Sequence, residues 1–212
     1  MHQVNVQSIS ISQGKRRLLE NSSLSVQTGD ILTISGVNGC GKSTLMKALF
    51  GTHKSDQLKW SLDSKPLGKP SPKNKLIAML PQDSFLPRDL TPSEIIAMLF
   101  KTHENQKPLF SMPYVADYSL KKLSELSHGA ARYIEIVVIL HLWHPFILLD
   151  EPFSLLAPLH KEAIKKLIVE KSKMKGIVIV DHYAEDINEI STNRIWIENG
   201  KLFHRKVAED AE

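Results

Sequence analysis

The feature that most constrains the fold is a glycine-rich run, Gly36-Val37-Asn38-Gly39-Cys40-Gly41-Lys42-Ser43-Thr44. A compact apolar segment, residues 31–35, precedes it and is typical of a buried parallel strand. The run leads into Lys42–Phe50, which has the apolar spacing of a helix. A strand, a glycine-rich turn and a helix in this order predict an α/β chain whose turn lies at the carboxyl end of a strand.

The same strand and helix rhythm returns later in the chain. Further buried parallel strands are expected at residues 76–80, 146–149 and 177–180, and helices at residues 160–171 and Ala184–Ile190. Antiparallel strands are expected at residues 4–11 and 24–26, and a further strand at residues 194–198 is followed by an Asn199-Gly200 hairpin turn.

Between residues 80 and 146 the strands stop and helical patterns take over. Helices are expected at residues 91–100, 119–123 and 127–142, whereas residues 61–74 and 102–113 have the weakest patterns. We therefore predict one domain, residues 1–212. It has an α/β P-loop core with an N-terminal antiparallel β part, residues 1–82 and 146–212, and an inserted helical subdomain at about 83–145.

Composition restricts the function only weakly. The formal net charge is +4, with lysines and arginines spread along the chain, which suits a phosphate ligand, a membrane surface or a nucleic acid. Cys40 is the single cysteine, so no internal disulfide is expected. We see neither a signal peptide nor an apolar run of about 18 residues, which predicts a cytoplasmic chain that does not itself cross a membrane.

The glycine-rich run matches a phosphate-binding loop in the context that makes this motif specific. Glycines let backbone N–H groups converge on phosphates at a helix N-terminus. Lys42 would supply charge to the β- and γ-phosphates, and the Ser43 hydroxyl would bind Mg²⁺. The candidate nucleotide contacts in the loop are Gly36, Asn38, Gly39, Cys40, Gly41, Lys42, Ser43 and Thr44.

Two carboxylates, Asp150 and Glu151, follow the apolar strand at residues 146–149. Ligand chemistry in open α/β sheets gathers at the carboxyl ends of strands. Asp150 would hold Mg²⁺, directly or through a water molecule, while Glu151 would orient and deprotonate the attacking water.

With these motifs in this order, the chain resembles the ATP-binding cassette family over nearly its whole length. Gln82 falls at the family's Q-loop glutamine, which contacts Mg²⁺ and the attacking water. Leu126-Ser127-His128-Gly129-Ala130 falls at the signature, and His182 at the switch histidine that reaches the γ-phosphate. Taken alone, Gln82 is an ordinary loop amide, His182 an ordinary strand-end histidine and Ser127 a routine helix N-cap.

The resemblance implies ATP and Mg²⁺ as cofactors and a head-to-tail pair of cassettes. Ser127 and Gly129 of one cassette would then close on the ATP held by the other, in a homodimer or with a different cassette. It also implies a membrane permease as partner, with this chain peripheral on the cytoplasmic face, and nucleic acid is not expected.

Several positions depart from the family pattern. His128 and Ala130 replace a glycine and a glutamine of the signature, and a protonated His128 would donate to a phosphate, which predicts tighter pairing at acidic pH. Ala157 stands where an acid makes a contact across the interface. Gln13 stands where an aromatic residue stacks on adenine, with Arg16 and Arg17 nearby.

The resemblance leaves three functions open: the ATPase subunit of a transporter, which we prefer, a soluble mechanical ATPase, and a regulatory cassette that hydrolyses ATP slowly. For a transporter, six apolar residues of the insert would either line a groove for a permease helix or form the core of the insert: Ile95, Ile96, Leu99, Phe100, Phe110 and Met112.

Overall fold

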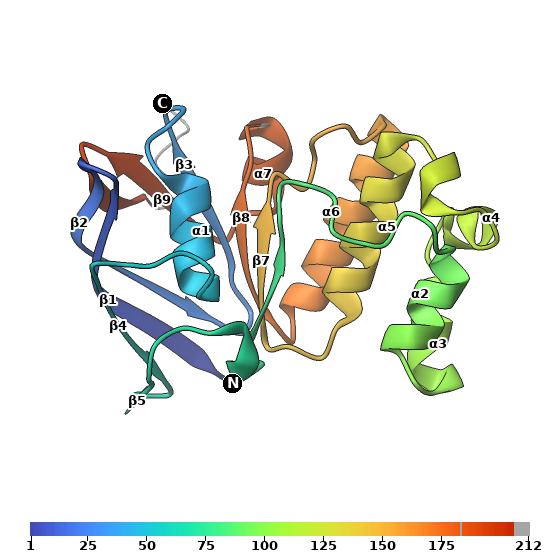
Figure 1. Ribbon diagram of the computed structural model, residues 1–212, viewed down its shortest axis with the longest axis horizontal. Coiled ribbons are helices and arrows are strands. Elements are labelled where there is room, and N and C mark those ends of the chain that lie inside the picture. Colours follow the sequence, from blue (N-terminus) through green and yellow to red (C-terminus); the bar gives the residue numbers. More distant parts are fainter. Residues whose placement is uncertain (183, 206–212) are drawn as a thin grey trace.

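Two β-sheets organise the computed structural model, which describes residues 1–182 and 184–205 (Figure 1). The first is antiparallel, in the order β2-β1-β4-β5: β1 (Gln3–Gln13), β2 (Arg16–Gln27), β4 (Gln57–Leu62) and β5 (Lys65–Pro66). The second has the order β10-β9-β3-β8-β7-β6: β3 (Ile31–Gly36), β6 (Ile77–Leu80), β7 (Phe146–Asp150), β8 (Gly176–Val180), β9 (Asn193–Glu198) and β10 (Lys201–Arg205).

Strands β9, β3, β8, β7 and β6 run parallel, and β10 pairs with β9 as an antiparallel hairpin. Every residue of β7 and β8 is buried, as expected for strands covered on both faces. Because these strands are parallel, the segments that follow β3, β6, β7 and β8 meet at one edge of the sheet.

The helices lie on either side of the parallel sheet and beyond it. They are α1 (Lys42–Phe50), α2 (Pro92–Leu99), α3 (His103–Phe110), α4 (Val115–Tyr118), α5 (His128–His141), α6 (Pro158–Ser172) and α7 (Ala184–Ile190), with 3₁₀ turns at Pro72–Asn74 and Leu123–Glu125. In Figure 1, α1 lies among the strands, α5 and α6 lie side by side, and α2 to α4 lie at the far end.

Two apolar clusters hold these layers together. One joins the antiparallel sheet, α1 and one face of the parallel sheet, and includes Ile9, Leu19 and Met46. The other joins the opposite face of the parallel sheet to α5, α6 and the insert, and includes Tyr133 and Ile164. Since α5 contributes a continuous series of buried side chains, it is the central support of the helical part.

The predicted fold class, an α/β P-loop core with an antiparallel part and a helical insert, is confirmed. Residues 206–212 of the predicted single domain lie outside the described part of the chain. Within that part, none of the helices has both the length and the apolar character that crossing a membrane requires.

The helix predicted at residues 119–123 is wrong. The structure places α4 one turn earlier, because Val115 is buried in the core whereas Leu120 is 85% exposed and has nothing to pack against. A 3₁₀ turn follows instead, in which the backbone N–H of Lys122 donates to the Glu125 carboxylate.

The weak stretches at residues 61–74 and 102–113 hold regular structure that the sequence pattern did not reveal. The first contains β5 and a 3₁₀ turn, and the second contains α3, whose start is capped by the Thr102 side chain. Strand β4 was also missed, although Trp60 within it is buried against β1.

Candidate nucleotide site

The glycine-rich loop connects β3 directly to α1, and two of its glycines are required by geometry. Gly36 has φ +152°, and a Cβ there would lie 2.8 Å from the carbonyl oxygen of Ile197. Gly41 has φ +107° and forms the N-cap of α1 without a side chain over the helix end. The first backbone N–H groups of α1 are therefore left uncovered by a capping side chain, as an anion site needs.

Lys42 is buried to 7% exposure, and its ammonium donates to the carbonyl oxygens of Gly36 (2.8 Å) and Val37 (3.2 Å). This places the positive charge across the mouth of the loop. Cys40 instead packs, half-buried, against the core, and its backbone N–H donates to the Val37 carbonyl.

Asp150 ends β7 with no exposed surface, and its Oδ1 accepts a hydrogen bond from the Ser43 hydroxyl at 3.0 Å. Burial raises the pKa of this carboxyl, and the Ser43 hydrogen bond opposes the shift. Its Oδ2 is buried and has no hydrogen-bond partner in the described structure. A buried carboxylate oxygen without a partner is costly, so this atom is suited to a cation.

The donor set of Ser43 and Asp150 fits Mg²⁺ bound in the way typical of nucleotide enzymes, with one carboxylate, one hydroxyl and the rest from phosphates and water. The described residues contain no group of three or more His, Cys, Asp or Glu that could hold a metal ion without other ligands.

Glu151 lies one residue further, between two side chains from neighbouring loops. Gln82 Nε2 donates to Glu151 Oε2 at 3.2 Å, and His182 Nε2 lies 3.0 Å from Glu151 Oε1. The backbone of Glu151 has φ +51°, in the left-handed region that costs a non-glycine residue about 1 kcal/mol. The three predicted catalytic residues are thus adjacent.

A cavity of about 220 Å³ lies between the glycine-rich loop and the residues Glu151 and His182, and Gln82 does not line it. It brings together predicted residues from separate segments, including Gln13, Lys42, Glu151 and His182. Leu18, which the sequence reasoning missed, also lines it, whereas Arg16 and Arg17 do not. Gln13, the predicted adenine contact, therefore shares the cavity lining with an aliphatic side chain. The remaining lining residues are Asn38, Gly39, Gly41, Ser43 and Thr44.

Ser127 and Gly129 do not line this cavity; both lie at the start of α5. The Ser127 side chain accepts from the Ala130 N–H at 3.2 Å, so the N-cap interpretation is confirmed. A Cβ on Gly129 would lie 2.4 Å from the carbonyl oxygen of Leu155, so only glycine fits against the loop that follows β7. His128 between them is exposed.

Two functional candidates on α5, Arg132 and Glu135, were also missed by sequence reasoning. They are buried to 7% and 1% exposure and form an ion pair at 3.2 Å. The signal that could have found them is a pair of opposite charges three residues apart inside an otherwise apolar helix, because buried charges need specific partners.

Known proteins match this chain over almost all of its length. Hemin import ATP-binding protein HmuV of Shewanella denitrificans is 30% identical, with 94% of this chain and 85% of that protein covered. Iron(3+)-hydroxamate import ATP-binding protein FhuC of Bacillus subtilis is 27% identical, with 98% and 83% covered.

Solved structures agree on the fold. The ATP-binding subunit of an ABC transporter superposes with a TM-score of 0.84 at 22% identity, covering 96% of this chain and 89% of that chain. A nucleotide-free ATP-binding cassette from an ABC transporter gives 0.82 at 22% identity, covering 97% and 92%. The family model described as ABC transporter matches residues 19–154, more than half of the sequence, and the chain belongs to that family.

Proposed function

We propose that this chain is the subunit of an ABC transporter that binds and hydrolyses ATP to drive transport. The observation that carries the proposal is the carboxylate of Glu151, held by Gln82 and His182 on the border of the cavity that the glycine-rich loop lines. Membership of the family supports ATP binding.

In the proposed reaction Glu151 accepts a proton from the attacking water, with Gln82 and His182 fixing the direction of its two oxygens. Lys42 stabilises the charge on the γ-phosphate. Mg²⁺, when bound at Ser43 and Asp150, neutralises charge on the phosphates. Charge stabilisation and positioning account for most phosphoryl-transfer catalysis, so none of these residues needs to form a covalent intermediate with the phosphate.

We further propose that two cassettes pair head to tail when ATP binds. Ser127 and Gly129 do not line their own chain's cavity, so their proposed contact with ATP needs a second cassette, whether a copy of this chain or a related one. The start of α5, where Ser127 and His128 are both exposed, is available for such a contact. Leu155, on the adjacent loop, is 69% exposed and would also lie in this interface.

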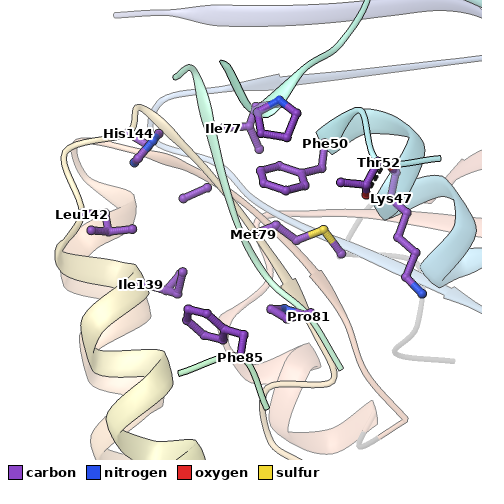
Figure 2. Close-up of a pocket in the computed structure, with 12 residues that line it drawn as sticks. Lys47, Phe50, Thr52, Ile77, Met79, Pro81, Phe85, Ile139, Leu142 and His144 are labelled. Atoms are coloured by element: carbon purple, nitrogen blue, oxygen red, sulfur yellow. Dashed lines mark hydrogen bonds between the residues drawn. The ribbon is translucent and has the colours of Figure 1, made fainter. Parts of the chain in front are cut away.

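The permease partner is proposed to dock in an apolar groove of about 440 Å³ between α1, β6 and the end of α5 (Figure 2). Of the two alternatives for the apolar residues of the insert, a groove or the core of the insert, burial favours the core. Ile95, Ile96 and Phe100 are buried core residues, while Leu99 is 40% exposed and Phe110 and Met112 pack partly buried against the core. The groove is lined instead by Lys47, Phe50, Thr52, Pro72, Ile77, Ala78, Met79, Pro81, Phe85, Ile139, Leu142 and His144.

Two observations favour a permease helix as the occupant of this groove. Its walls are mainly apolar, which suits the helix-in-groove mode of recognition. Pro81 and Phe85 in the wall flank Gln82, so an occupant would touch the segment that bears a proposed catalytic side chain. We assign import as the direction because the hemin and iron(3+)-hydroxamate relatives are both named for import, and we assign no cargo because theirs differ.

The test of hydrolysis compares the purified wild-type chain with Glu151→Gln and with Glu125→Gln, a matched carboxylate in the 3₁₀ turn at Leu123–Glu125. We expect Glu151→Gln to lower kcat by at least about a hundredfold while ATP still binds. Glu125→Gln should retain activity. Equal turnover in Glu151→Gln and wild type would refute the role of Glu151.

To test docking, the amount of the chain that is retained in membrane fractions of the source cell is measured for the wild type and for variants of the groove. Phe85→Glu places a charge in the groove and should release the chain from membranes. Phe203→Glu on β10 is the matched control, because Phe203 is 48% exposed and Phe85 is 40% exposed. Retention of Phe85→Glu at the wild-type level would contradict docking in this groove.

A further inference from the structure

A buried ion pair on α5 joins three parts of the protein that lie far apart in sequence. Arg132 donates through Nη1 to the carbonyl oxygen of Pro81 at 2.8 Å and contacts Glu135 Oε2 at 3.2 Å. Through Nη2 it donates to the carbonyl oxygens of Asp150 at 2.8 Å and Glu151 at 3.2 Å. One guanidinium thus holds the end of β7 and the start of the segment after β6 to the same helix.

Glu135 fixes the other end of that segment. Its Oε1 accepts from the Ser84 hydroxyl at 2.5 Å and from the Phe85 backbone N–H at 3.1 Å. With Arg132 bonded to Pro81, the ion pair holds both ends of residues 81–85. Pro81 and Phe85 are also walls of the apolar groove.

These contacts bear directly on the geometry of Glu151. Its left-handed backbone conformation is unfavourable and persists only where surrounding bonds hold it. Two such bonds are present: its N–H donates to the Val180 carbonyl at 2.7 Å, and its carbonyl accepts from Arg132. Loss of the second bond would let the carboxylate move relative to the cavity.

We propose that Arg132 and Glu135 are positioning residues that transmit movement of residues 81–85 to the Asp150–Glu151 peptide, and so couple occupancy of the groove to hydrolysis. The proposal rests on the proposed function. Besides this pair, the described structure links residues 81–85 to residues 150–151 by the bond from Gln82 to Glu151, a side-chain contact at an exposed residue; the β6–β7 ladder ends one residue earlier, at Leu80 and Leu149.

Comparison of the two routes favours the ion pair. Both routes use hydrogen bonds in which one group is charged, and burial strengthens such bonds. Arg132 and Glu135 make such bonds at 7% and 1% exposure and from a rigid helix, whereas Gln82 makes one bond on an exposed segment. A rigid connection made of several buried bonds transmits a displacement better than one exposed contact.

The experiment uses Arg132→Lys, which keeps the charge and the pairing with Glu135. A lysine ammonium lacks the planar fork needed to reach the carbonyls of both segments. We expect kcat to fall by about ten- to a hundredfold, because a displacement of about 1 Å costs up to that factor, with KM for ATP changed less than about twofold. Ser84→Ala removes one bond to Glu135 without exposing a buried charge, and should lower kcat by about two- to fivefold.

Tyr133→Phe is the matched control, since Tyr133 is on the same helix and loses a buried bond, from its hydroxyl to the Pro113 carbonyl at 2.7 Å. Its kcat should stay at the wild-type value. An equal fall of kcat in Tyr133→Phe would overturn the proposal, because it would show that α5 merely needs to be stable.

Amide hydrogen exchange of the nucleotide-free chain supplies a second measurement. Arg132→Lys and Ser84→Ala should exchange about fivefold faster in peptides covering residues 81–86, and Arg132→Lys also in those covering 150–153, the factor for one lost hydrogen bond. Unchanged exchange in both variants would overturn the link, even if the wild type proved unable to hydrolyse ATP. If Arg132→Lys does not fold, Ser84→Ala decides alone: unchanged kcat and exchange overturn the proposal, and the expected changes support it.

Discussion

The start of α6 lacks a cap, and this defect can be repaired. Ala157 is the N-cap of α6 with φ −65° and ψ 152°, the extended conformation that capping residues adopt, and it offers no side-chain acceptor. The helix's own bonds begin with the Lys161 N–H to the Ala157 carbonyl, so the preceding amides have no partner within the helix. The Ala157 side chain is exposed, which leaves room for a larger one.

Ala157→Asp should therefore stabilise the fold. A carboxylate at the N-cap accepts from the N–H groups at the second or third helical position, and its charge is favourable beside the positive end of the helix dipole. The expected gain is about 1 kcal/mol, which for a chain of this size raises Tm by about 2–4 °C. Ala157→Asn should give a similar gain through the hydrogen bond alone.

Urea unfolding and calorimetry of the nucleotide-free chain measure this gain. Thr102→Ala is the matched control with the opposite sign, because the Thr102 side chain caps α3 by accepting from the Asn105 N–H at 3.3 Å. It should cost about 1 kcal/mol. If Thr102→Ala destabilises while Ala157→Asp leaves the midpoint unchanged or lower, the reasoning about the start of α6 is refuted.

Three further predictions concern pH, packing and the metal. Burial lowers the pKa of His141 to about 4, so between about pH 6.5 and 4 the unfolded chain binds a proton that the native chain does not. The free energy of unfolding should therefore decrease by up to about 3 kcal/mol as the pH is lowered from about 6.5 to about 4. His141→Gln should flatten that dependence in urea titrations. Gly129→Ala should cost roughly 1–3 kcal/mol in urea unfolding, because its Cβ would meet the Leu155 backbone at 2.4 Å. Ser43→Ala should reduce the benefit of Mg²⁺ to ATP affinity by about tenfold, as measured by calorimetric titration with and without the ion.

The sequence alone was sufficient to predict those strands, helices and turns whose signal lies within a short stretch of residues. The apolar runs that became β7 and β8 and the glycine-rich turn before α1 each carry their signal within a few residues. The parallel order then explains why Asp150, Glu151 and His182 gather near the loop, since strand ends share an edge.

The parts that the sequence did not reveal depend on partners far along the chain. Strand β4 reads as a polar segment, but pairing with β1 buries Trp60. Arg132 and Glu135 look like surface charges until the bonds to Pro81 and Phe85 are seen. The insert residues Ile95 and Ile96 could not be assigned to a surface or a core from their spacing alone, because both arrangements have the same helical period.

Sedimentation of Glu151→Gln with Mg-ATP, with hydrolysis followed in the same samples, tests the catalytic role of Glu151 and the pairing of cassettes together. We expect the variant to bind ATP, not to turn it over and to accumulate as a dimer, while the wild type hydrolyses ATP and dimerises only transiently. A variant that hydrolyses ATP at the wild-type rate, or that binds ATP and remains a monomer at every concentration, would contradict the roles given to Glu151 and to Ser127 and Gly129.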